Sequence, residues 1–336
     1  MRKIILFGGS FDPIHDGHLT MAKHALKQRN ADELWFIVSA QNPFKEGSSA
    51  FHHRFEMVKL MTRPFKKMKV LDLESRMPLP SYSIDTVRVL KAQYNDCEFE
   101  WLIGSDQLPT LNQWKAFDEL RQQVQFVIYS RDSNVDTQFP RVIGPVLPIS
   151  STEIRKGFIT KTAPCVLQYM TERGLYLDEI LRNRVSMRRY EHVLRVKDLA
   201  LEIAAVHHVD AHRVALACMI HDLCKEDSDE ILLNIMKATF PHHIDLHSAF
   251  YHGFAAASEL SKKYYVRDKQ VLNAIRGHVN GASTHKIGMI LYIADKCERG
   301  RGYDSEPLIS LSKRNLVEGF QEVKRAQGAY LRRNNE

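Results

Sequence analysis

The hydrophobic periodicity of the chain changes near its middle, and this change constrains the fold more than any other feature. Short apolar runs of the buried parallel-strand type occupy residues 3–7, 33–38, 68–73, 99–104 and 124–130. Between these runs, apolar residues at helical spacing predict helices near 18–29, 51–63, 82–94 and 114–122. Strands and helices that alternate in this way predict a doubly wound α/β fold with a parallel sheet and ligands at the carboxyl ends of its strands.

The second half of the chain has a helical pattern throughout. Val193, Val196, Ala200 and Ile203 fall on one face of a predicted helix. Further helices are expected near 213–225, 228–238, 250–263, 268–277 and 285–296. We place the domain boundary at residue 182, within a basic stretch (Arg182, Arg184, Arg188, Arg189) that we interpret as a solvated linker. The prediction is an α/β domain over 1–182 and an all-α domain over 183–336.

Length and composition narrow the class of protein. A chain of 336 residues can bury two separate cores. No run of about 18 apolar residues is present, and "MRKIILFGG" indicates a strand rather than a signal peptide. Five cysteines without a CxxC motif indicate reduced thiols in a cytoplasmic protein. The net charge of +7 fits small anionic substrates, and without an RNA-binding motif we expect no nucleic acid partner.

The stretch "FGGSFDPIHDGHL" follows the first strand directly and leads into a helix. Gly8 and Gly9 allow a tight turn and a close approach of the backbone to a phosphate. His15 and His18 stand three residues apart at the helix start, so both imidazoles can face one ligand beside backbone N–H groups. A lone pair of histidines would indicate a turn at the surface, but the whole stretch favours a phosphate site.

A second stretch, "ISSTEIRKG" (149–157), has features of a helix start. Ser150 and Glu153 have the spacing of a capping box. Ser151, Thr152 and Arg155 at the same helix start also suit an anion site. The two interpretations are compatible, because a helix start can be capped and bind phosphate at once.

The pattern GGSFDPIH-x-GH, followed by SST-x-IR, resembles the nucleotidyltransferases with an HxGH signature, most closely bacterial nicotinate mononucleotide adenylyltransferases. The resemblance spans about residues 1–180, implies a Rossmann-like sheet, and includes NPFK (42–45), PSYSIDT (80–86) and IGSDQL (103–108). It implies that the ATP phosphates are held by His15, His18, Lys45, Ser151, Thr152 and Arg155. It also implies nucleotide contacts at Gly8, Ser10 and Phe11, and a pyridine nucleotide beside Tyr82, Thr86, Asp106 and Trp114.

The reaction that this resemblance implies transfers adenylyl from ATP to nicotinate mononucleotide. The attacking phosphate oxygen is already anionic, so alignment and charge neutralisation by the histidines, Lys45, Arg155 and Mg²⁺ suffice without a general base. The residues alone do not separate nicotinate from nicotinamide, but the resemblance favours the acid. A phosphopantetheine adenylyltransferase is a weaker match, because PSYSIDT and Trp114 fit the pyridine nucleotide enzymes better.

Histidine is concentrated in the second half, where 11 of the 16 histidines follow residue 183. His221 and Asp222 adjoin in "LACMIHDLCKE", at the end of an apolar run where polar groups without partners are costly to bury. Other predicted helices bring four more inward side chains of this type: His192, His252, His278 and Asp295. Four inward histidines and two aspartates suit one or two ions of iron, manganese or zinc better than they suit a core. The remaining histidines of this half are expected at the surface: His207, His208, His212, His242, His243, His247 and His285.

The order H…HD…H…H…D resembles the HD-domain phosphohydrolases. Over residues 184–336 the closer match is to the bacterial HD-type family that cleaves diadenosine tetraphosphate symmetrically into two ADP. The resemblance implies two metal ions, with iron favoured, held by His192, His221, Asp222, His252, His278 and Asp295. It also places Lys225 and Arg301 near the polyphosphate, with Asp222 and Lys225 in catalytic roles. The chain departs from the family pattern at Arg299 and Gly302, where that pattern has proline and aspartate.

The sequence thus predicts a bifunctional enzyme whose partners are ATP, nicotinate mononucleotide and diadenosine tetraphosphate. Three alternatives stay open. The helical half acts as a phosphatase on mononucleotides, or it is a non-catalytic binding or regulatory module, or the basic surface belongs to an RNA-processing enzyme. The sequence leaves open the oligomeric state and any communication between the two sites.

Overall fold

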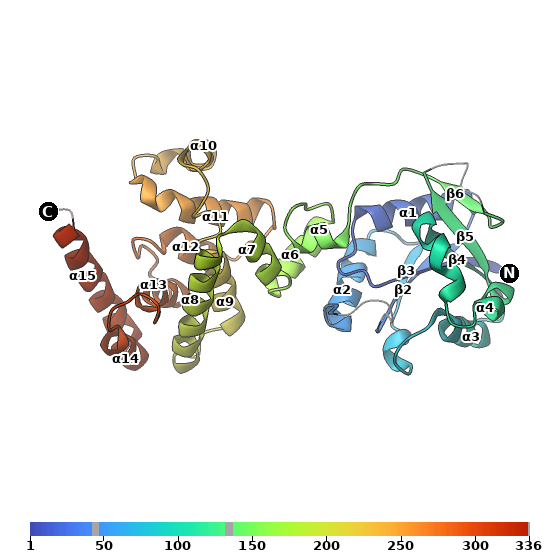
Figure 1. Cartoon of the computed structure of the whole chain (residues 1–336), viewed down its shortest axis with the longest axis horizontal. Helices are drawn as coiled ribbons and strands as arrows, with labels where there is room; N and C mark the ends of the chain where they lie inside the picture. Colours follow the sequence, from blue (N-terminus) through green and yellow to red (C-terminus); the bar gives the residue numbers. More distant parts are fainter. Residues whose placement is uncertain (42–46, 132–136, 335–336) are drawn as a thin grey trace. The chain divides into compact units, whose positions relative to one another are not determined.

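The computed structural model describes residues 1–41, 47–131 and 137–334 (Figure 1). Internal contacts divide the chain into two compact units. The first, here called the α/β unit, comprises Met1–Ile154 with Lys161–Val166. The second, here called the helical unit, comprises Arg155–Thr160 with Leu167–Glu336. Within the described ranges, none of the helices is long and apolar enough to span a membrane.

A six-stranded parallel sheet with strand order β3-β2-β1-β4-β5-β6 forms the centre of the α/β unit (Figure 1). Its strands are β1 (Arg2–Gly9), β2 (Glu33–Val38), β3 (Met68–Leu71), β4 (Cys97–Gly104), β5 (Gln125–Ser130) and β6 (Arg141–Ile143). The main connecting helices are α1 (Asp16–Gln28), α2 (Phe51–Thr62), α3 (Ser83–Gln93) and α4 (Phe117–Gln123). All five predicted strands and all four predicted helices are present, which confirms the doubly wound fold.

Two local features differ from the sequence prediction. The strand β6 was not expected, because it is three residues long and buries only Val142. The helix predicted near 114–122 begins at Phe117, and a 3-10 helix η2 (Ser105–Gln113) precedes it. Trp114 has an extended backbone between these two helices.

The strand order reverses between β1 and β4, so the carboxyl ends of these neighbours mark the switch point of the sheet. In the sheet register, Leu6 of β1 lies between Trp35 of β2 and Trp101 of β4. The face of the sheet that carries Leu6 packs against Ile84 and Leu90 of α3. The loop after β1 and the 3-10 helix after β4 therefore begin at the same edge, where ligands of such sheets bind.

The later helices are α5 (Ser151–Arg155), α6 (Pro164–Glu172), α7 (Leu177–Arg184), α8 (Met187–Val206), α9 (Ala211–Ile220), α10 (Asp229–Thr239), α11 (Tyr251–Lys262), α12 (Lys269–Gly277), α13 (Lys286–Cys297), α14 (Glu306–Arg314) and α15 (Leu316–Asn334). The predicted inward face of α8 is confirmed, because Val193, Val196, Ala200 and Ile203 are buried in one apolar core. The predicted helix near 213–225 ends earlier, at Ile220, and turns follow it. The last two helices were not predicted.

Two smaller expectations can be compared with the structure. All five cysteines have free thiols, as the odd count and the spacing indicated. Six of the seven histidines expected at the surface are exposed. The exception is His207, which is half-buried because its Nε2 lies 2.7 Å from the carbonyl oxygen of Ser312.

The helical unit begins before residue 182 when it is defined by contacts. Leu177, Ile180 and Leu181 of α7 are buried in the same core as the helices that follow them. Their apolar side chains therefore join the helical layer rather than the sheet. As a boundary between two family domains, residue 182 stays a prediction.

Candidate nucleotide and metal sites

Gly8 and Gly9 are the last residues of β1, where the absence of a side chain lets aromatic rings approach the backbone closely. The tight turn predicted at these glycines comes later, at Asp12 and Pro13. A Cβ atom on Gly8 would lie 2.9 Å from Cζ2 of Trp101, and one on Gly9 would lie 2.9 Å from Cζ of Phe11. Phe11 is buried and has a φ of 49°, and its ring meets that of Phe36 edge-on at 5.5 Å between centroids. The Phe11 side chain therefore belongs to the core, and the nucleotide contact predicted for this residue would involve its backbone.

His15 and His18 lie together at the start of α1. Their rings stack with centroids 3.7 Å apart and an angle of 29° between the planes. The backbone N–H of His15 donates a hydrogen bond to Nδ1 of His18 at 3.2 Å, so a neutral His18 ring carries its hydrogen on Nε2. Nδ1 of His15 is buried and has no hydrogen-bond partner among the described residues. A buried nitrogen of this kind indicates a place for a polar ligand.

The burial of His15 leads to a pH-dependent stability. Burial lowers the pKa of His15 to about 4, whereas an unfolded histidine titrates near 6.5. The unfolded chain therefore binds the proton more strongly, and the folded α/β unit loses stability as the pH falls from about 6.5 toward about 4. Between pH 7.5 and pH 5 we expect the wild type to lose about 2 kcal/mol more unfolding free energy than His15→Gln.

Urea unfolding followed by tryptophan fluorescence measures this difference. All three tryptophans of the chain, Trp35, Trp101 and Trp114, belong to the α/β unit, so their fluorescence reports on that unit. Equal pH dependence of the wild type and His15→Gln would contradict the expectation.

Arg54 of α2 joins the loops at the carboxyl edge of the sheet, although its side chain is only 2% exposed. Its Nε donates to the carbonyl oxygen of Ser49 at 2.8 Å. Its Nη1 donates to the carbonyl oxygens of Ser10 and Ser39 at 2.9 and 2.7 Å, and its Nη2 donates to that of Ala40 at 3.0 Å. The sequence did not identify Arg54, because an arginine within a helical pattern is usually a solvated residue.

We expect Arg54→Met to lower the unfolding free energy of the α/β unit by about 3 kcal/mol, because the carbonyl oxygens in one buried and three partly buried hydrogen bonds lose their donor. Arg63→Met is a matched control, since Arg63 is exposed at the end of the same helix. That control should change the unfolding free energy by less than about 0.5 kcal/mol. Tryptophan fluorescence in urea measures both, and equal stability of the two variants would contradict the expectation.

The predicted capping box at α5 is confirmed. The backbone N–H and Oγ of Ser150 donate to Oε2 of Glu153 at 3.1 and 2.9 Å, and the N–H of Glu153 donates back to Oγ of Ser150 at 3.2 Å. The hydroxyl of Ser151 donates to the carbonyl oxygen of Pro13 at 2.9 Å. Ser151 therefore contacts the same loop that leads to the two stacked histidines.

The other predicted phosphate ligands have different surroundings. Thr152 is the neighbour of Ser151 in the first turn of α5. The Nε of Arg155 lies 3.5 Å from Oε1 of Glu179, within the helical unit. Lys45 lies outside the described residues. The phosphate-binding roles of these side chains stay predictions.

Thr86, predicted to lie beside the pyridine nucleotide, is fully buried. Its Oγ1 donates to Oε1 of Glu74 at 2.8 Å, and Oε2 of Glu74 accepts the backbone N–H of Ala40 at 3.3 Å. The Thr86 side chain thus holds a buried carboxylate that joins two loops. Its hydroxyl is used by this contact, so a direct contact with the pyridine stays a prediction.

The three other residues predicted around the pyridine nucleotide are more accessible. Tyr82 is half-buried at the start of α3, and the ammonium group of Lys115 lies 4.2 Å from its ring centroid. Trp114 is half-buried and meets the Trp101 ring edge-on at 6.3 Å between centroids. Asp106 is exposed in η2, the segment that begins at the end of β4. Their substrate contacts stay predictions.

In the helical unit, the six predicted metal ligands lie in one buried cluster, and each is at most 7% exposed. They come from five elements: His192 on α8, His221 and Asp222 after α9, His252 on α11, His278 after α12 and Asp295 on α13. Two sets of ligand atoms each lie within 4.8 Å of one another. We name them the first ligand group (His192, His221, Asp222) and the second ligand group (Asp222, His252, His278).

Asp222 belongs to both ligand groups through different oxygen atoms. Its Oδ1 lies 3.3 Å from Nε2 of His252 and 3.4 Å from Nε2 of His278. Its Oδ2 lies 3.6 Å from Nε2 of His221 and 3.8 Å from Nε2 of His192. One carboxylate therefore stands between two sets of imidazole nitrogens.

The surroundings of His221 show that the first ligand group fits a cation. Its Nδ1 donates to the carbonyl oxygen of Cys218 at 2.6 Å, so a neutral ring has a lone pair on Nε2. That Nε2 is buried without a hydrogen-bond partner in the described chain, and it faces Asp222 and Asp295 at 3.6 and 4.0 Å. Burial lowers the pKa of His221 to about 4, so the ring is neutral at pH 7. A lone pair that faces two carboxylates is stabilised by a metal ion.

The second ligand group also fits a cation. Nδ1 of His278 donates to the carbonyl oxygen of Ile275 at 2.7 Å, which leaves a lone pair on its Nε2. Nε2 of His252 lies 3.1 Å from that atom, and burial lowers the pKa of His252. The Nε2 atoms of His252 and His278 and one oxygen of Asp222 therefore converge on one point, as the ligands of a second metal ion would.

Both carboxylates of the cluster are in the form that binds a cation. Burial by itself would raise the pKa of Asp222, but its contacts with the surrounding histidines keep that pKa well below its ordinary value. Burial acts in the same direction on Asp295, and Lys296 and the histidines outweigh it. Asp222 and Asp295 are therefore ionised at neutral pH, as metal ligands must be.

The two cationic residues predicted beside this cluster both contact a predicted ligand. Nζ of Lys225 lies 3.5 Å from Nδ1 of His252, and burial lowers the pKa of this lysine. Arg301 donates through Nη2 to Oδ1 of Asp295 at 2.8 Å. Both side chains thus border the cluster despite the departures of the neighbouring sequence from the family pattern.

Two further cations at the cluster were not predicted. Nη1 of Arg189 donates to Oδ2 of Asp222 at 2.6 Å, and Nζ of Lys296 donates to Oδ2 of Asp295 at 2.7 Å. The interpretation of the stretch around Arg189 as a solvated linker is therefore wrong for this residue. The i, i+3 spacing between Arg189 and His192 could have indicated that both side chains lie on the same side of the helix.

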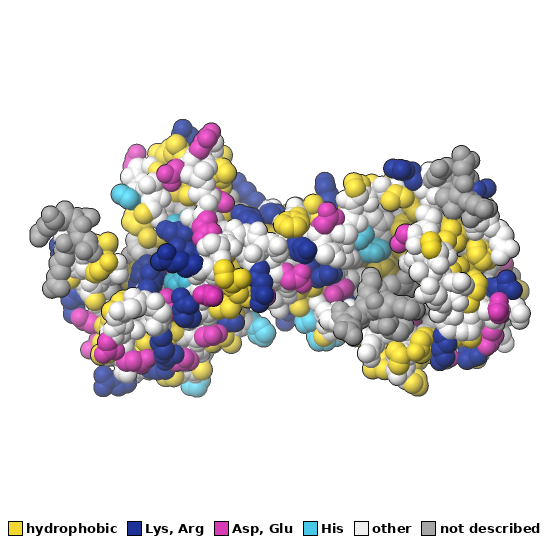
Figure 2. Space-filling view, in the orientation of Figure 1, with side chains coloured by type: hydrophobic (Ala, Val, Ile, Leu, Met, Phe, Trp, Pro, Cys, Tyr) yellow, Lys and Arg dark blue, Asp and Glu magenta, His cyan; other side chains and the backbone are white. Residues whose placement is uncertain are grey.

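Lys and Arg side chains gather with histidine on one face of the helical unit (Figure 2). Such a surface attracts polyanions.

Glu298 is a buried carboxylate at the cluster that the sequence also did not identify. Its side chain is 2% exposed, and Oε1 lies 3.2 Å from Nδ1 of His192. Oε2 accepts Nε of Arg195 at 2.7 Å and the N–H of Gly300 at 2.6 Å. Burial alone would raise the pKa of Glu298, but these donors outweigh burial and lower it. The carboxylate is therefore ionised.

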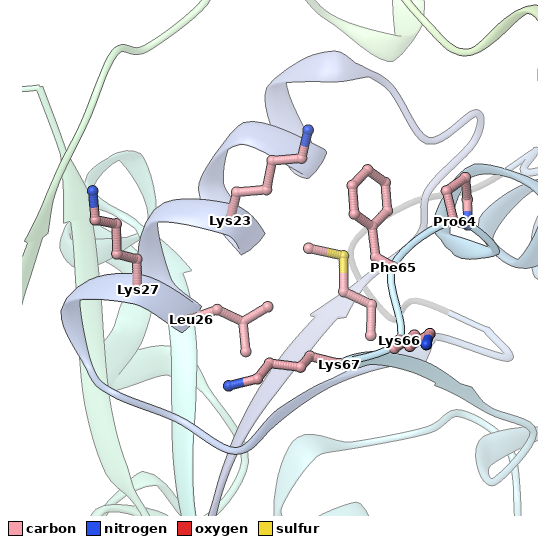
Figure 3. Close-up of a pocket in the computed structure, with 8 residues that line it drawn as sticks. Lys23, Leu26, Lys27, Pro64, Phe65, Lys66 and Lys67 are labelled. Atoms are coloured by element: carbon pink, nitrogen blue, oxygen red, sulfur yellow. The ribbon is translucent and has the colours of Figure 1, made fainter.

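A pocket of about 440 Å³ in the α/β unit contains none of the predicted site residues (Figure 3). Four of the side chains that line it are Lys23, Lys27, Lys66 and Lys67. The ammonium group of Lys23 lies 4.6 Å from the ring centroid of Phe65. The lining has neither a carboxylate nor an imidazole, so it has no side chain of the kinds that form the metal cluster.

The matches to known proteins agree with this division into two sites. The cytidylyltransferase-like family matches residues 6–157, and the HD domain matches residues 189–300. The chain is 33% identical over 341 residues to a probable nicotinate-nucleotide adenylyltransferase/Ap4A hydrolase of Mycoplasma genitalium, covering 95% of this chain and 96% of the relative. A protein of the same name in Mycoplasma pneumoniae is 30% identical over 338 residues, covering 94% and 96%.

Among solved structures, the chain is similar to the Plasmodium falciparum nicotinic acid mononucleotide adenylyltransferase complexed with NaAD. That match has a TM-score of 0.46 at 23% identity, and it covers 52% of this chain and 98% of the other.

Proposed function

The chain belongs to the family of the bifunctional nicotinate-nucleotide adenylyltransferase/Ap4A hydrolases, and we propose that each of its two units carries one of the two activities. The observation that supports this pairing is that relatives with the fused name align with nearly the whole chain. The stacked histidines and the buried His/Asp cluster supply one candidate site in each unit.

In the α/β unit, the proposed reaction transfers the adenylyl group of ATP to nicotinate mononucleotide. A phosphate oxygen of the mononucleotide forms a bond to the α-phosphorus of ATP, and the bond to pyrophosphate breaks. The products are nicotinate adenine dinucleotide and pyrophosphate. Because the attacking oxygen is anionic, the site must align two phosphates and neutralise their charge.

His15 and His18 at the start of α1 are the groups best placed to donate hydrogen bonds to these phosphates, and they follow closely on the glycines that end β1. We assign Lys45, Ser151, Thr152 and Arg155 to the remaining phosphate contacts. Mg²⁺ bound with ATP supplies further positive charge. The backbone around Ser10 and Phe11 contacts the nucleotide, and the pyridine nucleotide lies near Tyr82, Thr86, Asp106 and Trp114.

The transfer activity is tested with ATP and nicotinate mononucleotide, with the dinucleotide and pyrophosphate measured as products. Nicotinamide mononucleotide serves as the matched substrate, since it differs only in the charge of the pyridine substituent. A preference for the acid supports the proposal. Equal use of both substrates would contradict the specificity, and no dinucleotide from either would contradict the activity.

In the helical unit, the proposed reaction hydrolyses diadenosine tetraphosphate symmetrically into two ADP. Asp222 supports this reaction most directly, because its two oxygens serve two adjacent ligand groups. We assign His192, His221, Asp222, His252, His278 and Asp295 as ligands of two divalent metal ions, with iron favoured. When bound, such ions supply Lewis acidity at phosphate oxygen and activate water for attack on phosphorus.

The chain's own residues bind and orient the polyphosphate. Lys225 and Arg301, together with Arg189 and Lys296, place four positive charges around the cluster. These charges offset the negative charge of a polyphosphate and hold its central phosphates beside the ligand groups. Water attacks one of the two central phosphorus atoms, and the departing oxygen leaves as the terminal phosphate oxygen of the second ADP.

Chromatography of the products formed from diadenosine tetraphosphate by purified protein of known metal content tests this proposal. Two ADP support symmetric cleavage, whereas AMP and ATP would contradict it. Release of phosphate from mononucleotides without cleavage of diadenosine tetraphosphate would indicate a phosphatase instead. No turnover by a metal-loaded chain with a working transferase would indicate a binding or regulatory module.

A further inference from the structure

All four histidines of the metal cluster have a group within hydrogen-bond distance of Nδ1, but only His192 has a carboxylate there. His221 and His278 each donate through Nδ1 to a backbone carbonyl oxygen three residues earlier, at 2.6 and 2.7 Å. His192 instead has Oε1 of Glu298 at 3.2 Å from its Nδ1, and the two residues stand 106 positions apart in the chain. The orientation of His192 thus depends on a residue that can be replaced.

The surroundings of the two carboxylates that flank His192 indicate where its ring hydrogen resides. Asp295 lies 3.2 Å from Nε2 of His192, and its oxygens already accept from Arg301 at 2.8 Å and from Lys296 at 2.7 Å. Oε1 of Glu298 has no such cation within hydrogen-bond distance among the described residues, since Nε of Arg301 lies 3.8 Å away. The ring hydrogen of His192 is therefore more stable on Nδ1, where it bonds to Glu298, than on Nε2, where it would bond to Asp295.

We propose that Glu298 is a positioning residue that keeps the hydrogen of His192 on Nδ1 and so presents the Nε2 lone pair to the first ligand group. The proposal rests on the metal centre described above and extends it to a residue outside the six ligands. Buried carboxylates that accept a hydrogen bond from a metal-bound histidine typically affect metal affinity by 10- to 100-fold.

Glu298→Gln changes the hydrogen-bonding pattern with little change in shape. Oε2 of Glu298 accepts from both Arg195 and Gly300, so the single amide oxygen of glutamine should stay with these two donors. Its NH₂ group then faces Nδ1 of His192 and requires a lone pair there. The ring hydrogen moves to Nε2, where it blocks metal binding.

Two measurements test the proposal. Calorimetric titration of the full chain with Mn²⁺ should show two equivalents in the wild type, one of which binds about 10- to 100-fold more weakly in Glu298→Gln. In the metal-free chain, nitrogen NMR of labelled histidine should show His192 with its hydrogen on Nδ1 in the wild type and on Nε2 in the variant.

Glu202→Gln is the matched control, because Glu202 also pairs with an arginine, Arg299, but lies away from the ligands. It should bind Mn²⁺ as the wild type does.

Unchanged Mn²⁺ affinity in Glu298→Gln, or a wild-type His192 with its hydrogen on Nε2, would overturn the proposal. If Glu298→Gln does not fold, the tautomer of the wild type decides by itself. A wild type that binds no Mn²⁺ would refute the metal centre, whereas two equivalents bound with the same affinities in both proteins would refute only the role of Glu298.

Discussion

Asp222→Ala is expected to abolish hydrolysis of diadenosine tetraphosphate, by more than about 10³-fold, while dinucleotide synthesis stays unchanged. Asp222 supplies Oδ1 to the second ligand group and Oδ2 to the first, so a single substitution removes a ligand from both. Both metal equivalents should therefore be weakened or lost. Product chromatography and metal analysis of the purified chain measure the two effects.

Asp198→Ala is the matched control for this experiment. Asp198 is exposed on the solvent side of α8 and pairs only weakly with Lys197, at 3.6 Å. It should retain full hydrolysis and full metal content. Synthesis of the dinucleotide by Asp222→Ala shows that the remainder of the variant is folded. Wild-type hydrolysis by Asp222→Ala would show that the His/Asp cluster is not the hydrolytic site.

His18→Ala should lower kcat/KM for dinucleotide synthesis by about 10²- to 10³-fold and leave hydrolysis unchanged. Its imidazole stacks on His15 and accepts the backbone N–H of that residue, so the substitution removes both a proposed phosphate ligand and the support for its neighbour. The measurement is the initial rate of dinucleotide formation at several ATP concentrations.

His24→Ala provides the comparison on the same helix. The ring of His24 is half-buried, and its Nδ1 lies 2.9 Å from the carbonyl oxygen of Thr20, one turn earlier. Its loss should leave kcat/KM for synthesis within about twofold of the wild type. A fall of both activities in His18→Ala, with the fold preserved, would mean that the two sites depend on one another.

The strands and the order of the histidines could be predicted because the signals are local in sequence. Runs such as 33–38 and 99–104 are mostly apolar, as central parallel strands are, with one glutamate in each (Glu33 and Glu100), and they form β2 and most of β4. The adjacent His221 and Asp222 at the end of an apolar helix likewise identify a buried polar pair without knowledge of the fold. These features depend on a few neighbouring residues.

The site features that could not be predicted from the sequence depend on contacts between segments that are distant in the chain. Glu298 reaches His192 because α13 packs against α8, and Arg189 reaches Asp222 because α8 packs against α9. Thr86 lies in a motif associated with the substrate, yet its hydroxyl is buried against Glu74. Side-chain orientation of this kind is decided by tertiary packing.

The four carbonyl oxygens that Arg54 binds belong to the main chain, which has an evolutionary consequence. Every amino acid offers the same carbonyl group, so the identities of Ser39, Ala40 and Ser49 are not constrained by these bonds. Selection that preserves this loop arrangement therefore acts on Arg54, whereas the loop residues that supply the carbonyl oxygens can be substituted. The side chains of these loops can therefore change during evolution, and substrate preference with them, while Arg54 keeps the loops in the same arrangement.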